Sequence, residues 1–445
     1  MKKTICILFL ILMLAPVASF GAANPPELAA EAAVLMDAGT GQVLYEKNMD
    51  AQYAPSSLAK IMTAIIAIES KPLSDTVTVS KTAINSDVAP RKASHISLVE
   101  GEELTLKDLL YAMIVQTAND AANVIAEYIA GSLDGFTQMM NTKAQELGCI
   151  NTNFTNPTGL DDENNYTSAY DVALITKYAI RDASFSEIFA AKEYTIQKTN
   201  KTAARELSTG CAMLKEGDSY YERLTGGLSG WTSNAKYNCA SHAEKSDKSY
   251  ICIILKGTST TSRYTDSIAL YNYTFDNFKK VTLKNTDIPR TTIDVVTNGT
   301  KTGEVKLSYA KDISLWLYND LSLLDISVRT DAPEIYTTEP NTPPNMLITV
   351  KSDKMYNTVI KTPYIMETSQ GVYTSEEPVQ KKENGFVSFL KGLGIIFLVI
   401  LILFIAFIIC MRIINARRRR KKLEAKRRKE RRERLHRMED TFGRK

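Results

Sequence analysis

The chain has 445 residues and a formal net charge of +4, from 54 Lys or Arg and 50 Asp or Glu. Three His and six Cys without the spacing of zinc ligands provide no constellation for a metal site. The net charge is misleading, because residues 412–445 alone hold 17 Lys or Arg against five acidic residues and leave the rest of the chain acidic. An acidic main portion does not favour nucleic acid as a partner.

The N-terminus has the order of residues typical of a secretory signal peptide. Lys2 and Lys3 precede an apolar run, residues 5–17, and small residues follow up to Ala23. A short membrane anchor is the alternative, but the run is too short to span a bilayer comfortably. We therefore expect residues 1–23 to be a signal peptide that is removed on export.

A second apolar run, residues 393–411, is uncharged and long enough to cross a membrane as a helix. Nineteen residues rise about 28 Å, close to the thickness of the hydrocarbon core. A buried core helix is the alternative. The basic tail, residues 412–445, favours a cytoplasmic end that lies against anionic lipid rather than nucleic acid. We therefore expect a single-pass cell-membrane protein, with a linker at 376–392 and everything from residue 24 to the linker outside the cytoplasm.

Residues 24–281 mix strand and helix patterns and predict one α+β domain. Ala33–Met36 and Gln42–Tyr45 flank a turn and predict a hairpin, and residues 237–255 predict a second hairpin in the same mostly antiparallel sheet. A closing helix is expected around 268–278. Apolar residues at helical spacing predict further helices between the two hairpins, at about 57–70, 106–115, 120–129, 135–147 and 169–180.

Residues 282–375 contain short alternating strands separated by turn clusters and predict a small all-β domain. The strand patterns lie at 292–296, 304–307, 313–317 and 346–350.

Four cysteines lie between the two apolar termini. Two of these, Cys239 and Cys252, occupy the paired runs of the second predicted hairpin. A cross-strand disulfide is one interpretation, since the compartment allows it, and two buried free thiols are the favoured one.

The sharpest local feature is Ser57 followed by Lys60 at the start of the helix predicted over 57–70. That helix is apolar nearly all round, which predicts an interior position. Residues three apart share one helical face, and a desolvated lysine amine can accept the proton of a serine hydroxyl. An interior helix has no packing reason to carry an amine, because an unpaired buried charge is costly. The pair is therefore a candidate nucleophile and base.

Longer strings make a family resemblance specific. The sequence at 33–46, AVLMDAGTGQVLYE, and at 55–63, PSSLAKIMT, resembles the low-molecular-weight penicillin-binding proteins, which are serine D-alanyl-D-alanine carboxypeptidases. Strings at 119–122, 146–148 and 151–161 agree, and the likeness extends from residue 30 to about 280. The resemblance implies a β-lactamase/transpeptidase-like domain, followed by a small β domain and a C-terminal transmembrane helix.

In that family an S-x-x-K motif supplies the nucleophile, and S-x-N and K-T-G motifs line the cleft. The resemblance assigns Ser57 as nucleophile, Lys60 as its proton acceptor, the Thr117 hydroxyl as a proton relay and Asn119 as a binding group for a substrate amide. A helix cap ahead of Asp120 is the alternative for the second motif.

The third motif departs from the family pattern. By its spacing, the K-T-G position falls on Leu228, Ser229 and Gly230, so the hydroxyl and the glycine remain but the cation is lost. Losing one charged partner costs about 1.5–3 kcal/mol, or about ten- to a few hundredfold in affinity or rate. Arg263 matches a family arginine near the substrate carboxylate, and a solvated arginine at a helix start is the alternative for it. The resemblance also implies that the Trp231 and Ser57 backbone N–H groups form the oxyanion site.

The resemblance therefore implies an enzyme that removes the terminal D-alanine from peptidoglycan stem peptides and that β-lactam antibiotics acylate. It implies no metal and no organic cofactor. The alternative is an impaired module of the same fold that binds cell-wall peptide or has a regulatory role, which the loss of the K-T-G lysine favours.

Overall fold

The computed structural model describes residues 24–85, 93–288, 290–297, 300–309, 311–331, 335–337, 347–352, 355–361, 364–368 and 371–374. The expected signal peptide, linker, transmembrane helix and basic tail lie outside these residues. Within the described ranges, no helix is both long and apolar enough to cross a membrane.

The first part of the chain is built on a five-stranded antiparallel sheet in the order β2-β1-β9-β8-β7. β1 (Ala32–Asp37) and β2 (Val43–Lys47) form the predicted N-terminal hairpin. β8 (Lys236–Lys245) and β9 (Lys248–Gly257) form the second predicted hairpin, and β9 pairs with β1 in the middle of the sheet. β7 (Leu224–Thr232) is the terminal strand, so only one of its edges is paired within the sheet.

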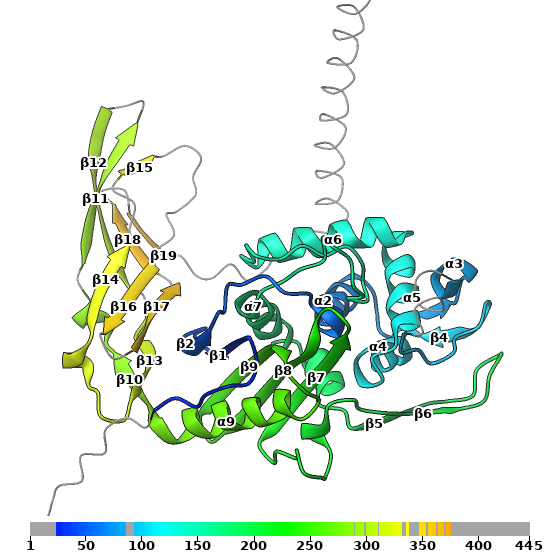
Figure 1. Ribbon diagram of the computed structural model, residues 1–445. Coiled ribbons are helices and arrows are strands. Elements are labelled where there is room, and N and C mark those ends of the chain that lie inside the picture. Colours follow the sequence, from blue (N-terminus) through cyan, green and yellow to red (C-terminus); the bar gives the residue numbers. More distant parts are fainter. Residues whose placement is uncertain are drawn as a thin grey trace, which may run out of the picture. The chain divides into compact units, whose positions relative to one another are not determined.

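Helices cover both faces of this sheet and create two separate cores (Figure 1). One core contains β-strand side chains packed against α2 (Ala59–Ser70), α4 (Leu106–Val115), α5 (Asn119–Ala130) and α7 (Ala169–Ala179). The other packs α9 (Ser262–Asn277) against the opposite face. Because side chains alternate across a strand, each residue of β7 belongs to one face or the other.

The α2 helix lies in the interior, as its all-round apolar pattern predicts. Its residues from Ala59 to Ala67 are all buried, and a short 3-10 turn, η1 (Ser56–Leu58), leads directly into it. The predicted helices over 106–115, 120–129, 135–147 and 169–180 are present as α4, α5, α6 (Leu133–Glu146) and α7. The closing helix, α9, begins at Ser262, six residues before the start predicted for it.

Several short elements lack a recognisable sequence pattern. They are α3 (Lys81–Asn85), α8 (Ala183–Phe189) and two small hairpins, which pair β3 (Thr76–Thr78) with β4 (Glu103–Thr105) and β5 (Glu193–Ile196) with β6 (Arg205–Ser208). The two hairpins lie outside the main sheet, and β4 leads directly into α4.

Strands dominate after α9. β10 (Phe278–Leu283) pairs with β13 (Ile313–Tyr318), and Trp316 of β13 exchanges two hydrogen bonds with the Gln42 side chain. The remaining strands form two sheets. One has the order β15-β11-β12-β18-β19 and the other β14-β16-β17. Their bounds are β11 (Thr291–Thr297), β12 (Thr300–Tyr309), β14 (Ser327–Asp331), β15 (Ile335–Thr337), β16 (Leu347–Ser352), β17 (Met355–Lys361), β18 (Tyr364–Thr368) and β19 (Gly371–Thr374).

The four cysteines of the described ranges are buried free thiols. Cys239 pairs with Ile254 and Cys252 pairs with Ser241, so the two predicted partners are not directly opposite each other in the β8–β9 ladder. The favoured interpretation of two buried thiols is therefore confirmed.

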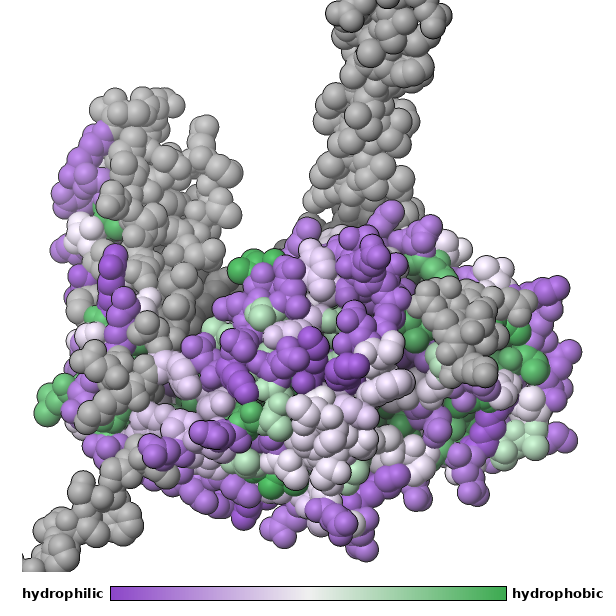
Figure 2. Space-filling view, viewed as in Figure 1, coloured by the Kyte–Doolittle hydropathy of each residue, from purple (hydrophilic) through white to green (hydrophobic). Residues whose placement is uncertain are grey.

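The surface of the first part is mainly hydrophilic on the face shown in Figure 2, with apolar residues in small groups. The large hydrophobic side chains that are exposed in the described ranges include Trp231, at the end of β7.

Candidate active site

Ser57 lies in the η1 turn, between the sheet and the start of α2. The preceding residue, Ser56, has φ 47° and is completely buried, so the turn adopts a left-handed conformation that is unusual for a non-glycine residue. Two glycines permit this turn. A Cβ on Gly159 would lie 1.7 Å from the Ser56 carbonyl oxygen, and a Cβ on Gly230 would lie 2.4 Å from Ser56 Oγ and 2.7 Å from the Ser57 nitrogen. The backbones of the 159 loop and of β7 therefore approach the candidate nucleophile directly.

Asn238 of β8 fastens the same turn to the sheet. Its completely buried amide Nδ2 donates to the carbonyls of Ala54 and Pro55 and to Ser56 Oγ, at 3.0–3.2 Å. Its Oδ1 accepts the backbone N–H of Lys256 at 2.8 Å. Four hydrogen bonds to one buried amide fix the position of the turn relative to the sheet.

Lys60 lies one turn into the helical segment, beneath the partly exposed Ser57. Its completely buried Nζ lies 3.4 Å from Ser57 Oγ and donates to Asn119 Oδ1 at 2.8 Å and to the Thr158 carbonyl at 2.6 Å. Burial lowers the pKa of Lys60 from 10.5 to about 7, and the Coulombic effect of Asp120 opposes this shift. A substantial neutral fraction at neutral pH leaves a lone pair that can accept the proton of Ser57.

Thr117 and Asn119 lie where α4 ends and α5 begins. Asn119 joins Lys60 through its Oδ1, while its Nδ2 donates to the Ser94 carbonyl at 2.9 Å. The Thr117 hydroxyl faces Ser94 Oγ at 3.4 Å, and Thr117 has φ 54°, which is strained for a β-branched residue. The N-cap of α5 is Ala118, without a side-chain cap, so the alternative of a capping motif is wrong.

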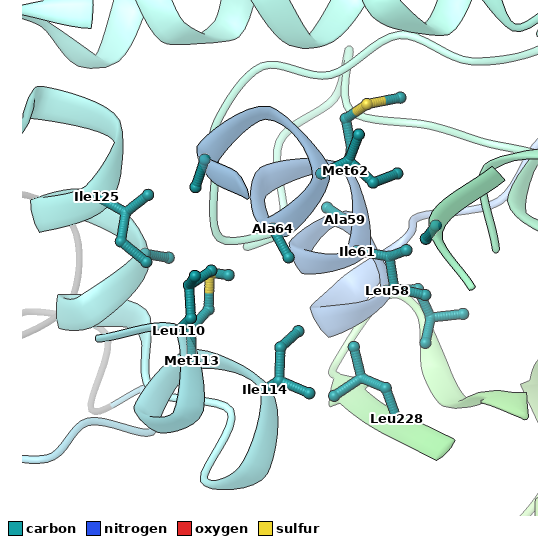
Figure 3. Packing of buried hydrophobic residues seen from close by; sticks show 14 of the residues in the cluster. Leu58, Ala59, Ile61, Met62, Ala64, Leu110, Met113, Ile114, Ile125 and Leu228 are labelled. Carbon is teal, nitrogen blue, oxygen red and sulfur yellow. The ribbon is translucent and has the colours of Figure 1, made fainter. Parts of the chain in front are cut away.

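Leu228 fills the position of the expected lysine with an apolar side chain. It is 1% exposed and lies beside Ile114 and Leu58 in the core that contains α2 (Figure 3). Leu228 and Gly230 share one face of β7, and that face contacts η1 and α2. In the described residues, this face of β7 therefore contributes no second cation beside Lys60.

Ser229 and Trp231 point to the opposite face of β7. The Ser229 hydroxyl donates to the Gly210 carbonyl at 2.9 Å, which also accepts the Tyr264 hydroxyl at 3.1 Å. The Trp231 side chain is 56% exposed, and its ring centroid lies 6.4 Å from that of Tyr237. Ser229 therefore contacts protein backbone, whereas Trp231 presents an aromatic surface at the end of the strand.

Arg263 lies in the first turn of α9 and is buried, so the alternative of a solvated arginine is wrong. Its Nη1 donates to the Gly230 carbonyl at 2.9 Å and to the Asn238 carbonyl at 3.5 Å. Within the described part of the chain, its Nε is buried without a hydrogen-bond partner. The guanidinium group therefore places a positive charge immediately behind β7.

Sequence reasoning missed the groups that hold these residues in place. Asn238, Gly159, Ser94 and the Thr158 carbonyl all contact the motif residues, and two of them, Asn238 and Ser94, belong to no local pattern that marks them. Only the string at 151–161 pointed to one of these segments. In the described ranges, no group of three His, Cys, Asp or Glu side chains could hold a metal ion.

A partly exposed serine, a desolvated amine within reach of its hydroxyl, and a strand with one unpaired edge beside it together define a site for serine acyl transfer. This chemistry needs a nucleophile, a proton acceptor and a surface that aligns the acyl group. The geometry provides all three.

Comparison with known proteins agrees with this class. Residues 19–259 match the model of the D-alanyl-D-alanine carboxypeptidase family, which is more than half of the chain, and the chain belongs to that family. The carboxypeptidase DacF of Bacillus subtilis is 29% identical over 371 residues, which cover 82% of this chain and 90% of that protein. DacC of Escherichia coli is 32% identical over 264 residues, or 58% of this chain and 64% of that protein.

Solved structures give the same result for the fold. Penicillin-binding protein 5 from Haemophilus influenzae is 25% identical, with a TM-score of 0.58 over 76% of this chain and 98% of that one. The Streptomyces K15 DD-transpeptidase is 28% identical, with a TM-score of 0.54 over 57% of this chain and 100% of that one. The chain is therefore an α+β protein with the penicillin-binding transpeptidase and carboxypeptidase fold, and the serine carboxypeptidase activity expected from the sequence agrees with these relatives.

Proposed function

We propose that Ser57 is the nucleophile of a D-alanyl-D-alanine carboxypeptidase that shortens peptidoglycan stem peptides. One observation carries the proposal: a partly exposed serine hydroxyl lies 3.4 Å from a completely buried amine whose pKa is lowered to about 7. Neutral Lys60 accepts the hydroxyl proton as Ser57 attacks the carbonyl between the two terminal D-alanines. The C–N bond of the tetrahedral intermediate then breaks, and D-alanine leaves with the proton that Lys60 returns to its nitrogen. Water then hydrolyses the acyl-enzyme, which releases the shortened peptide and restores Ser57.

The peptide aligns along the unpaired edge of β7 in this proposal. An extended peptide can add to the edge of a sheet through main-chain hydrogen bonds. The close approach of Gly230 to Ser57 then brings the scissile carbonyl within reach of the hydroxyl. The backbone N–H groups of Ser57 and Trp231 stabilise the oxyanion. Thr117 relays protons, and Asn119 orients Lys60 and the substrate amide.

Carboxylate recognition is the weakest part of the proposed site. Arg263 remains behind β7, but Leu228 provides no cation and the Ser229 hydroxyl is engaged with Gly210. We therefore expect peptide turnover to be reduced more than acylation by penicillins, because the strained β-lactam amide is intrinsically more reactive than the peptide amide.

The test is acylation of the purified full-length protein by a labelled penicillin, followed by measurement of D-alanine release from a pentapeptide. Ser57→Ala should abolish both signals. Ser233→Ala, which removes an exposed serine near the end of β7, is the matched control and should retain labelling. Equal labelling of wild type and Ser57→Ala would contradict the proposal.

The second candidate function is a module that binds stem peptide without turnover. The apolar burial of Leu228 favours it, because one family cation is replaced by a residue that belongs to the core. Labelling at Ser57 without D-alanine release, together with saturable binding of the pentapeptide, would support the module and reject the hydrolase.

We further propose that the protein is held in the cell membrane by residues 393–411, with the basic tail on anionic lipid of the inner leaflet. The uncharged length of that run and the basic residues after it support the proposal. A protease added to intact cells should remove the penicillin-labelled domain and leave the tail protected. Protection of the labelled domain would refute this topology.

A further inference from the structure

In the described residues, the Lys60 amine has three hydrogen-bond partners, and one of them can give it a proton. Nζ lies 2.8 Å from Asn119 Oδ1, 2.6 Å from the Thr158 carbonyl oxygen and 3.4 Å from Ser57 Oγ. The oxygen of Asn119 is identified by its amide nitrogen, which donates to the Ser94 carbonyl. An amide oxygen and a backbone carbonyl only accept hydrogen bonds, whereas a serine hydroxyl can also donate.

These partners fix the direction of the lone pair on the neutral amine. A neutral amine carries two N–H groups and one lone pair. The two acceptors take the two N–H groups, so the lone pair is left facing the Ser57 hydroxyl. If the Thr158 carbonyl moved away, one N–H group could turn toward Ser57, and the base would present a donor in place of its lone pair.

The carbonyl that holds the amine belongs to a loop, residues 156–160, that contacts the start of α2. The Pro157 carbonyl accepts the Thr63 hydroxyl at 2.8 Å. Two residues further on, a Cβ on Gly159 would lie 1.7 Å from the Ser56 carbonyl oxygen. These two loop residues and the one between them are buried. Three consecutive residues of the loop therefore contact η1 and α2, with the contact to the amine in the middle.

Asn156 holds this loop in its turn. Its Oδ1 accepts the Thr158 hydroxyl at 2.7 Å and the backbone N–H groups of Thr158, Gly159 and Leu160 at 2.8–3.2 Å. Its Nδ2 donates to the Leu160 carbonyl at 3.1 Å. Asn side chains fold the backbone in this way by bonding to the N–H groups that follow them. The direction of the Thr158 carbonyl therefore depends on one side-chain oxygen.

We propose that Asn156 is a positioning residue: through the Thr158 carbonyl it keeps the lone pair of the Lys60 amine directed at the nucleophile. The inference rests on the proposed function of Ser57 and Lys60. The loop holds the base, whereas the peptide aligns along β7 in the proposed function. The effect of Asn156 therefore falls on the rate of acylation and not on the binding of the ligand.

A purely structural role for Asn156 makes a different prediction. A collapsed loop would disturb the turn that contains Ser57 together with the surface that binds the ligand, so affinity and rate would fall together. Loss of the carbonyl's direction alone lowers the limiting rate and leaves the affinity in place.

Asn141 of α6 offers a matched control, because it fastens the same stretch of chain at another point. Its Oδ1 accepts the Phe154 N–H at 2.7 Å, and its Nδ2 donates to the Phe154 carbonyl at 2.8 Å. Both Asn141 and Asn156 are partly buried, and both use the two ends of the amide. Asn141→Ala therefore loosens the chain two residues before Asn156 and leaves the bonds to Asn156 Oδ1 in place.

The experiment measures acylation of the purified full-length protein over a range of labelled-penicillin concentrations, which separates the limiting rate from the half-saturating concentration. Asn156→Ala should lower the limiting rate about 30-fold, since a displacement of about one ångström at a reacting group can cost 100-fold. Its half-saturating concentration should change by less than about threefold. Asn156→Asp keeps the acceptor oxygen and should be at least about fivefold faster than Asn156→Ala. Asn141→Ala should lower the melting temperature and keep the limiting rate within about threefold of wild type.

Equilibrium binding adds a readout that needs no turnover. Calorimetry with a pentapeptide that ends in D-alanyl-D-alanine uses the Ser57→Ala protein, with and without Asn156→Ala. The two dissociation constants should agree within about threefold. Asn156→Ser keeps a shorter acceptor, and it replaces Asn156→Ala in both measurements if that protein does not fold.

Four results would overturn the inference: a wild-type limiting rate in Asn156→Ala, an equal loss of rate in Asn141→Ala, an Asn156→Asp protein as slow as Asn156→Ala, or pentapeptide binding weakened about tenfold or more. Failure of the proposed function is recognised separately, because Ser57→Ala would then remain labelled. Labelling confined to Ser57, with a wild-type rate in Asn156→Ala, rejects the role of Asn156 alone.

Discussion

Replacing Gly230 by alanine tests whether the contact between β7 and the nucleophile turn governs the chemistry. The added Cβ would lie 2.4 Å from Ser56 Oγ, 2.7 Å from the Ser57 nitrogen and 3.1 Å from the Ser57 Cβ. Two of these distances are shorter than Cβ contacts in real proteins, and one involves a backbone atom that cannot rotate away. Gly230 is not in the left-handed region, so the conflict is purely steric. The strand and the turn must therefore separate by roughly half an ångström to one ångström.

The expected cost is about 1–3 kcal/mol of stability from overpacking, and about 100-fold in acylation rate from misplacement of the nucleophile. Gly227→Ala is the matched control on the same strand. Its Cβ would lie 2.8 Å from Cys211 Sγ, on the face away from Ser57, so it should lose stability but keep the acylation rate within about threefold. Urea unfolding and labelled-penicillin kinetics measure both effects. Wild-type acylation in Gly230→Ala would refute the reasoning.

Three further predictions follow from the same contacts. Burial lowers the pKa of Lys60 from 10.5 to about 7, so between these pH values the unfolded chain binds a proton at Lys60 that the native state does not. The free energy of unfolding of wild type should therefore rise relative to Lys60→Met as pH rises from about 7 to 10.5, by up to about 5 kcal/mol. Paired urea titrations measure this difference. A constant difference across that range would contradict the buried, neutral amine. If the missing cation limits turnover, Leu228→Lys should raise D-alanine release by about tenfold or more. The same change should lower the melting temperature, because Leu228 is buried, whereas Leu228→Met should leave both release and melting temperature nearly unchanged. No gain in release would reject the missing cation as the defect. Asn238→Asp should lower the free energy of unfolding by about 2–3 kcal/mol, because the three hydrogen bonds that Asn238 Nδ2 donates become contacts between two acceptors. The change should also slow acylation. Unaltered stability in thermal unfolding would show that the amide does not hold the turn.

Much of the fold could be predicted because its pattern is local. The all-round apolar character of α2 predicted its burial, and the turn between β1 and β2 predicted the first hairpin. The start of α9 was missed because the residues around Arg263 are polar and show no apolar period, whereas Arg263 is buried against the Gly230 and Asn238 carbonyls of β7 and β8. Short elements such as β5 and β6 were missed because few of their residues are buried, which leaves no alternation to detect.

The candidate site divides in the same way. Ser57 and Lys60 could be proposed from spacing because both lie on one turn. The role of Asn238 could not, because its contacts join residues more than 180 positions apart in sequence. The resemblance placed Arg263 and Asn119 in the cleft, but only coordinates show that Ser229 donates to Gly210. A side chain's direction on a strand depends on register, which the sequence leaves undetermined.

The identity of the acylated residue tests the central claim most directly. The chain carries two adjacent serines in the η1 turn, and only Ser57 is within reach of the Lys60 amine; Ser56 is buried against Asn238. Peptide mapping by mass spectrometry after brief treatment with penicillin should find one adduct per chain, on Ser57, formed faster as pH rises through about 7. An adduct on any other residue, or no adduct on folded protein, would contradict the account.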